Sequence, residues 1–144
     1  MSYPESAASV MQTEMKFKSE TIEALQRYKE ANPWKGKIET RCNKMATLHN
    51  ELCTIYGRYT GLRFNEVRLG AAAGSSGNSS YNPHFDTITI DTKLSVITYL
   101  HEFAHALKGS DEVYAVRWSC SLFKKVFPEK WDRLVSDKHT MVVG

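Results

Sequence analysis

The chain has 144 residues, of which 42% are hydrophobic and 24% charged, proportions typical of a globular domain with one hydrophobic core. Its formal net charge is only +3, which gives little reason to expect nucleic-acid binding. No stretch approaches the roughly 20 apolar residues of a membrane span. Residues 1–10 lack the basic start and apolar run of a secretory signal. We therefore expect a cytoplasmic protein without a membrane partner.

Hydrophobic periodicity and turn residues divide the chain into helices and short strands. The expected elements, in chain order, are helices over 10–31 and 36–56, strands over 62–69 and 86–91, and helices over 93–108, 112–127 and 129–135. This order predicts an α+β fold in which a small sheet of two to three strands packs against helices. We expect a single domain over residues 11–136, with flexible tails at 1–10 and 137–144.

The helix boundaries are marked by capping residues. Asp91 or Thr92 is expected to cap the helix over 93–108, and Gly109 to end it in a left-handed turn. The next helix is expected to be capped by Ser110 or Asp111. Its inward-facing residues are predicted to be Val113, Val116, Ser119, Cys120 and Phe123.

Other potential metal ligands are scattered. Cys42 and Cys53 lie eleven residues apart, three helical turns, and should share one face of the helix over 36–56. With Cys120 they are expected to be buried free thiols in a reducing compartment, Cys120 being the alternative candidate for a metal ligand. His49 falls beside the apolar stripe of the same helix, so we expect a hydrogen-bonded histidine at the edge of the core.

The most specific pattern is His101-Glu102-Phe103-Ala104-His105, which reads H-E-x-x-H on a predicted helix. Two histidines four residues apart lie about 40° apart around a helix, so both imidazoles project from one face. A tetrahedral Zn²⁺ needs this arrangement from two of its ligands. Glu102 can then take a proton from a zinc-bound water without binding the metal itself. The pattern therefore predicts a zinc-dependent hydrolase, most often a peptidase.

The helix that carries this pattern has an apolar stripe typical of a buried helix. The stripe consists of Leu94, Ile97, Leu100, Phe103, Ala104 and Leu107. Because burial of unpaired polar groups costs several kcal/mol, two histidines and a glutamate on such a helix need partners. A bound metal with its water would supply partners for all three side chains.

A catalytic zinc takes three protein ligands, so a third is required. Asp111 and Glu112 follow closely, and both could fold back over the helix that carries the histidines. Glu112-Val113-Tyr114-Ala115 resembles the E-x-x-A signature of the glutamate-type zincins. With the preceding H-E-x-x-H helix and the Pro that ends the following one, residues 86–128 resemble the ImmA/IrrE-like small metallopeptidases. The resemblance implies a minimal zincin with His101, His105 and Glu112 as zinc ligands.

Other third ligands remain open. Asp111 lies six residues after the second histidine, which resembles the spacing in metzincins, but those proteins have Gly where this chain has Lys108. We therefore favour Glu112 over Asp111. His139 would be the ligand in a SprT-like protease, and His84 is a weaker alternative.

If the chain is a peptidase, Glu102 is the proton acceptor that assists attack of the zinc-bound water on the peptide bond of a protein or peptide substrate. The strand over 86–91 resembles the edge strand on which zincins lay their substrate, and the loop over 74–80 would border that cleft. The donors considered for the developing oxyanion are Tyr114, Tyr81, Tyr99, His84 and Arg117.

Two alternatives to a general peptidase follow from the same residues. A SprT-like protease would act on DNA-bound proteins and bind DNA with a steep salt dependence, which the small net charge argues against. A non-catalytic binding module would keep the zincin fold, with or without zinc. Glu102 argues against that alternative, because a purely structural metal site has no use for a general base.

Overall fold

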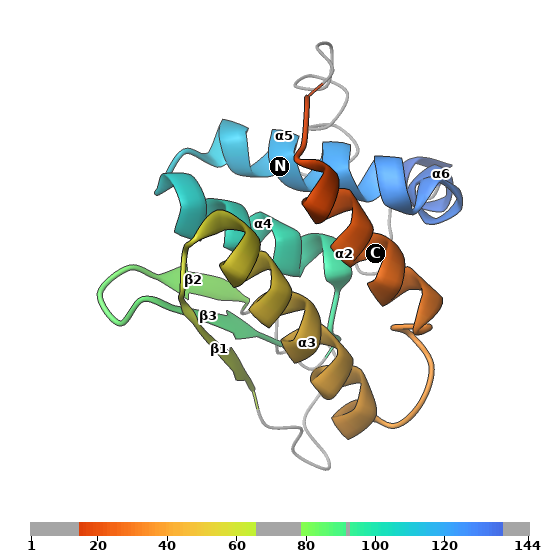
Figure 1. Cartoon of the computed structure of the whole chain (residues 1–144), viewed down its shortest axis with the longest axis horizontal. Helices are drawn as coiled ribbons and strands as arrows, with labels where there is room; N and C mark the ends of the chain where they lie inside the picture. The colour runs from red at the N-terminus through yellow and green to blue at the C-terminus, as the bar shows by residue number, and fades with distance from the viewer. Residues whose placement is uncertain (1–14, 66–78, 92, 137–144) are drawn as a thin grey trace.

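The computed structural model of this chain describes residues 15–65, 79–91 and 93–136 (Figure 1). Its elements are α2 (Ser19–Glu30), α3 (Ile38–Tyr56), β1 (Gly61–Phe64), β2 (Ser80–Asn82), β3 (Thr87–Ile90), α4 (Val96–Lys108), α5 (Glu112–Val126) and α6 (Pro128–Ser136). The fold is α+β, as predicted. None of the helices in these ranges combines the length and the apolar character of a membrane span.

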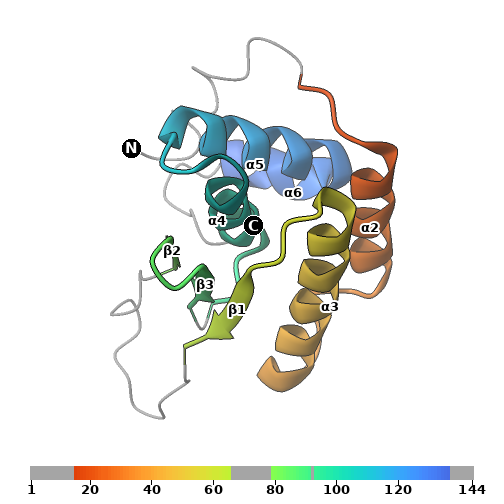
Figure 2. The same cartoon turned by 60° about the vertical axis from the view of Figure 1, so that its left-hand side comes forward.

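Helix α4 lies at the centre of the molecule. It packs against α5 on one side and against β2 and β3 on the other, while α2 contacts both α3 and α5. Figure 2 shows α4 between the sheet and the α5–α6 layer, with α2 and α3 closing one side. Nine of its thirteen residues are buried, as expected of a core helix. The helix of the H-E-x-x-H pattern is therefore held on two faces by other elements.

The sheet has three strands in the order β1-β3-β2, with β1 parallel and β2 antiparallel to β3. Ile88 and Ile90 of β3 share its buried face and are fully enclosed. Two sequence-based expectations were wrong here. The three-residue strand β2 was missed, and the segment 86–91 is not an edge strand, because β3 pairs on both sides and β1 and β2 form the two edges.

The start of α2 also differs from the prediction. A helix was expected from residue 10, but it begins at Ser19, and residues 15–18 are not helical; residues 10–14 lie outside the described ranges. Lys18 has extended backbone angles. Phe17 packs edge-on against Trp118 of α5, with ring centroids 5.9 Å apart. This tertiary contact holds the segment before α2 against α5.

Helix α4 begins later than predicted, and its cap is neither Asp91 nor Thr92. Thr92 lies outside the described residues, and the Asp91 carboxylate accepts the backbone N–H of Lys93 in a tight turn. Leu94 has φ of +52° and a buried side chain, and a residue in that conformation cannot continue a helix. The cap is Ser95, whose hydroxyl accepts the N–H of Thr98.

The junction between α4 and α5 follows the prediction more closely. Gly109 ends α4 with φ of +79°, although its ψ of −149° lies outside the left-handed helical region that was expected. Asp111 caps α5 by accepting the N–H of Tyr114. Val113 was predicted to face inward and is 60% exposed, because it lies on the outer side of the first turn.

Several remaining predictions concern single elements. The helix over 36–56 and the last two helices are confirmed within two residues at each end. The first strand ends at Phe64, and residues 66–69 of the predicted strand, the loop over 70–78 and both predicted tails lie outside the described ranges. The three cysteines are free thiols, with Cys53 and Cys120 buried and Cys42 half-buried.

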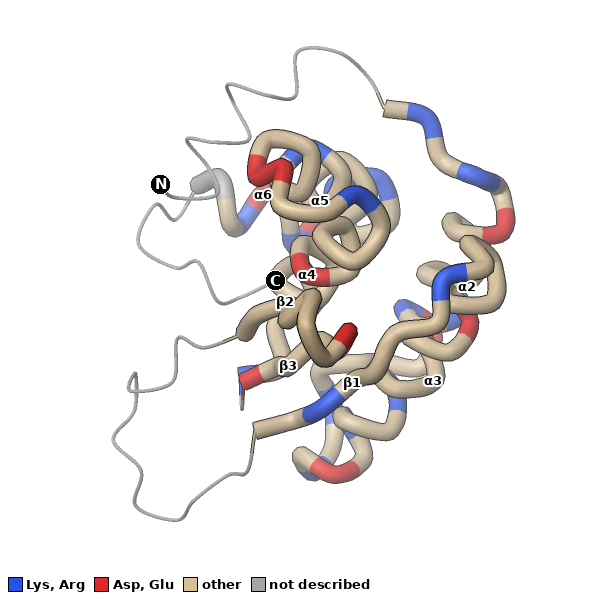
Figure 3. Tube along the Cα trace, turned by 90° about the vertical axis from the view of Figure 1, so that its left-hand side faces the viewer, with Lys and Arg blue, Asp and Glu red and all other residues tan. Residues whose placement is uncertain are grey.

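Charged residues are distributed over the described helices without separation by sign. Figure 3 shows Lys and Arg positions interspersed with Asp and Glu positions. One ion pair of this kind joins α2 to α3, with 2.6 Å between Arg27 Nη2 and Glu51 Oε1. Both of its side chains are substantially exposed, so the pair contributes about 0–1 kcal/mol to stability.

Candidate metal centre

Three side chains with nitrogen or oxygen donor atoms converge where α4 meets α5. His101 and His105 lie one turn apart on α4, and Glu112 begins α5 after the reversal at Gly109. The two Nε2 atoms are 3.2 Å apart. Glu112 places one carboxylate oxygen 2.8 Å from His101 Nε2 and the other 3.1 Å from His105 Nε2. Among the described residues, these are the three that form a potential metal-binding group.

The donor set fits zinc. Two ligands bound about 2.1 Å from a tetrahedral zinc lie about 3.4 Å from each other. The closest pairs, which involve both Glu112 oxygens, are 2.8 to 3.2 Å apart, and with one atom taken from each residue all three lie within 4.8 Å of one another, which is close enough to surround one ion. Two imidazoles and one carboxylate are also the ligands of many catalytic zinc sites, which keep a fourth position for water.

The orientation of His105 supports metal binding through Nε2. Its Nδ1 lies 2.8 Å from the carbonyl oxygen of Gly109. Because a carbonyl oxygen can only accept, Nδ1 carries the proton, and in the neutral ring Nε2 has its lone pair free toward the other ligands. Metal-binding histidines commonly donate their second nitrogen to a carbonyl in this way.

His101 is the most enclosed of the three candidate ligands. It is 8% exposed, whereas His105 is half-buried and Glu112 is exposed. Burial lowers the pKa of His101, and the Glu112 carboxylate offsets part of this effect. The neutral ring favoured by burial is the form that binds a metal.

Glu102 lies beside this group without being part of it. The cavity at the site, about 480 Å³ in volume, is lined by all four side chains, with Ser79, Ser80, Tyr81, Pro83, Gly109 and Ser110. Burial raises the pKa of Glu102 to about 7, while His105 and a hydrogen bond from the Tyr81 backbone amide act in the opposite direction. A carboxylate in this position can exchange a proton with a water or substrate in the cavity.

The structure separates Glu112 from the other candidates for the third ligand. The Asp111 carboxylate is used to cap α5. His84 is exposed in the turn between β2 and β3, against the ring of Phe85, and His139 lies outside the described ranges. His49 is buried and hydrogen-bonded to Tyr99 and Thr60, as predicted for a core histidine.

Of the five residues considered as oxyanion donors, only Tyr81 lines the cavity. Its hydroxyl is already bonded to Asp86 and Arg58. Tyr99 is fully buried and paired with His49, and Tyr114 packs against the core. Ser79 and Ser80, at the end of the predicted loop over 74–80, line the cavity. Residues 74–78 lie outside the described residues.

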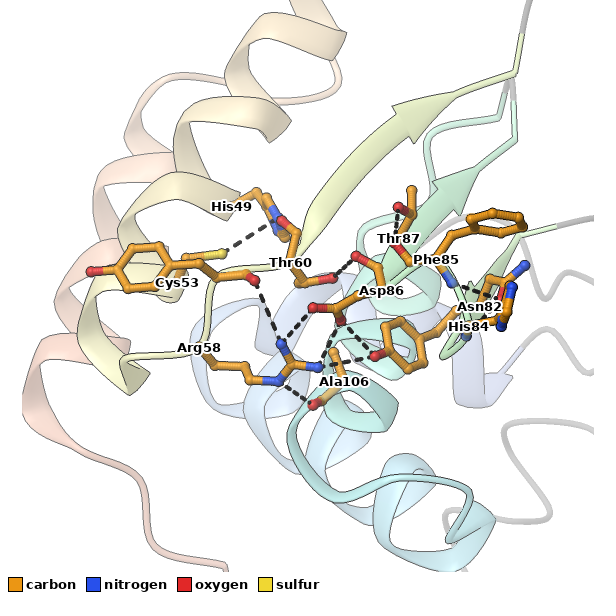
Figure 4. Close-up of polar contacts among 12 residues, drawn as sticks. His49, Cys53, Arg58, Thr60, Asn82, His84, Phe85, Asp86, Thr87 and Ala106 are labelled. Atoms are coloured by element: carbon orange, nitrogen blue, oxygen red, sulfur yellow. Dashed lines mark hydrogen bonds and ion pairs between the residues drawn. The ribbon is translucent and has the colours of Figure 1, made fainter.

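Sequence reasoning missed two parts of this site. One is β2, which supplies Ser80 and Tyr81 to the cavity. The other is a polar network in which Arg58, from the loop after α3, binds Asp86 and Tyr81 (Figure 4). Arg58 and Asp86 are 28 residues apart, and neither belongs to a recognisable motif, so no local signal pairs them.

Comparison with known proteins adds no assignment. No family model matches this chain, and neither a curated protein nor a solved structure is similar enough to count as a match. The functional argument therefore depends on the site itself.

Proposed function

We propose that this chain is a cytoplasmic zinc metallopeptidase of the zincin type, most like the ImmA/IrrE-like enzymes. The observation that carries the proposal is the convergence of His101, His105 and Glu112 beside Glu102 in one cavity. Two imidazoles, one carboxylate and an adjacent second carboxylate are the groups that a catalytic zinc and a general base require. A structural metal site would need a fourth protein ligand and no base.

In the proposed reaction His101, His105 and Glu112 hold zinc, which when bound polarises a carbonyl and makes a water more acidic. Glu102 accepts the proton of the attacking water. The same carboxyl group then donates that proton to the leaving amine as the peptide bond breaks. Its place in the cavity, one residue after a proposed ligand, supports both roles.

The substrate is proposed to bind along β2. This strand is the edge of the sheet on the cavity side, and Ser80 and Tyr81 both line the cavity. An extended peptide can add to such an edge through backbone hydrogen bonds, with little dependence on its own side chains. This replaces the sequence-based expectation that the segment 86–91 would serve as the edge.

The proposal is tested by incubating the zinc-loaded full chain with a mixture of unstructured peptides and identifying products by mass spectrometry. We expect cleavage that is lost on chelation, is restored by zinc and is strongly reduced in Glu102→Gln. Asp111→Ala is the matched control, since it removes a neighbouring carboxylate that faces its own helix. Zinc binding without cleavage of any peptide would overturn the peptidase and favour a binding module.

A further inference from the structure

Arg58 joins three segments that are distant in sequence. Its Nη1 and Nη2 form a two-pronged ion pair with Asp86, at 2.9 and 2.7 Å from the two carboxylate oxygens. Nη2 also donates to the Tyr81 hydroxyl at 3.0 Å, and Nε donates to the carbonyl oxygen of Ala106 at 2.9 Å. Figure 4 shows the guanidinium between the β2–β3 turn and the end of α4. We call Arg58, Tyr81 and Asp86 the arginine clamp.

The side of the clamp on the sheet is rigidly built. The Tyr81 hydroxyl donates to Asp86 at 2.6 Å, so the carboxylate binds both the guanidinium and the phenol. The Asp86 backbone carbonyl accepts the N–H of Gly61 and the hydroxyl of Thr60. These bonds fix the β2–β3 turn to the segment that enters β1.

The other side of the clamp is the last turn of α4. Ala106 lies directly after the ligand His105, and its carbonyl is among the last four of the helix, which have no partner within the helix. The Arg58 Nε–H satisfies this carbonyl. The clamp therefore attaches β2 to α4 next to the metal-binding residues.

Tyr81 connects the clamp to Glu102. Its side chain is part of the clamp, and Tyr81 and Glu102 line the same cavity, where β2 packs against α4. A shift of β2 away from α4 would widen the cavity that both residues line. Glu102 is buried, so a wider cavity would expose its carboxylate to water and change its surroundings.

We infer that Arg58 is a positioning residue, which holds β2 against α4 so that β2 and the Glu102 carboxylate keep their relative positions in the cavity. The catalytic consequence rests on the proposed function, but the positioning itself does not. The metal ligands are held differently, by the packing of α4 on α5. Loss of the clamp should therefore move the base and leave the ligands in place.

The clamp is suited to positioning more than to stability. The side chains of Arg58 and Asp86 are 34% and 43% exposed, and ion pairs of that exposure add little to the free energy of folding. A guanidinium forms two parallel bonds to a carboxylate, which an ammonium cannot do. Arg58→Lys keeps the charge and loses this geometry, so it is the appropriate variant.

The first experiment measures hydrogen exchange of the Tyr81 amide in the full chain by NMR. We expect exchange about tenfold faster in Arg58→Lys, with no change at Ile88 and Ile90 and with unaltered zinc content. Tyr81→Phe, which leaves the Arg58–Asp86 ion pair intact, should accelerate exchange to a smaller extent. Arg27→Lys is the matched control, because Arg27 also pairs with a carboxylate but lies on α2.

The second experiment measures peptide cleavage. Arg58→Lys should lower kcat about tenfold with a smaller change in KM, and should have no further effect in a Glu102→Gln background, since the clamp acts through Glu102. Unchanged Tyr81 exchange in Arg58→Lys, or equal acceleration throughout β3, would overturn the inference. Faster Tyr81 exchange in a protein that cleaves no peptide would support the positioning role and refute only the peptidase.

Discussion

Two histidine sites, one on α3 and one on α4, differ in what their ring nitrogens face. His49 is 3% exposed, and its nitrogens lie 2.7 Å from the Tyr99 hydroxyl and 2.7 Å from the Thr60 carbonyl. The carbonyl requires a proton on Nε2, so the hydroxyl donates to Nδ1 and the neutral ring is fully paired. At the second site, Nε2 of His101 and of His105 face each other and a carboxylate.

The difference teaches how a structural histidine can be distinguished from a candidate ligand. The protein completes the hydrogen bonds of His49 with one donor and one acceptor. The α4 histidines and Glu112 bring three electron-pair donors together, an arrangement that a cation stabilises. Burial alone does not separate the two sites, since His101 is almost as enclosed as His49.

The largest expected effect comes from Glu102. Glu102→Gln should lower the rate of peptide cleavage by about 10²–10⁴-fold, because it removes the proton acceptor. Zinc content should be unchanged, since Glu102 is not among the converging ligands. Steady-state kinetics and elemental analysis on the same preparation check this. Wild-type activity in the variant would remove Glu102 from the mechanism.

Removal of His49 should affect stability without affecting the metal. We expect His49→Ala to lower the free energy of unfolding by about 2–4 kcal/mol, because it leaves the buried Tyr99 hydroxyl unpaired and creates a cavity. Urea denaturation measures the loss, and zinc content should remain that of the wild type. Loss of zinc from a folded His49→Ala protein would break the distinction between the two sites.

Acid should also destabilise the fold through His49. Burial lowers the pKa of His49 from its ordinary value of 6.5. At pH values between 6.5 and the folded-state pKa, the unfolded chain therefore binds more protons at His49 than the folded chain does. The free energy of unfolding therefore falls as pH drops below 6.5, by at most about 1.4 kcal/mol per pH unit. Burial also lowers the pKa of His101, so His101 adds to the acid sensitivity of the wild type and of the His49 variant alike. His49→Gln should show the shallower pH dependence; an equal slope would contradict the prediction.

The smallest effect is expected at Asp111. Asp111→Ala removes the cap of α5 and should cost about 1 kcal/mol in stability. Zinc should be retained, because the Asp111 carboxylate points into its own helix terminus. Thermal denaturation with and without zinc measures both. A variant that keeps its stability but loses zinc would make Asp111 a ligand.

The candidate metal-binding group could be predicted because its members are close in sequence. His101 and His105 are placed by helical periodicity, and Glu112 follows His105 by seven residues across one glycine reversal. The capping role of Asp111 follows from equally local chemistry. Such short-range geometry depends little on the rest of the fold.

The features that were mispredicted depend on distant partners. The strand β2 has three residues and exists through pairing with β3, and without it β3 was taken for an edge. Residues 15–18 have helical composition, yet Phe17 is held by Trp118. Leu94 has φ of +52° with its side chain in the core, so tertiary burial overrides a local preference.

The central claim is tested most directly by zinc content per chain, measured by elemental analysis for the wild type, His105→Ala, Glu112→Ala and Asp111→Ala. We predict about one zinc in the wild type and in Asp111→Ala, and little or none in the other two variants. Circular dichroism on each sample confirms that the chain is folded. A folded wild type that binds no zinc after reconstitution, or a Glu112→Ala protein that keeps it, would contradict the metal centre.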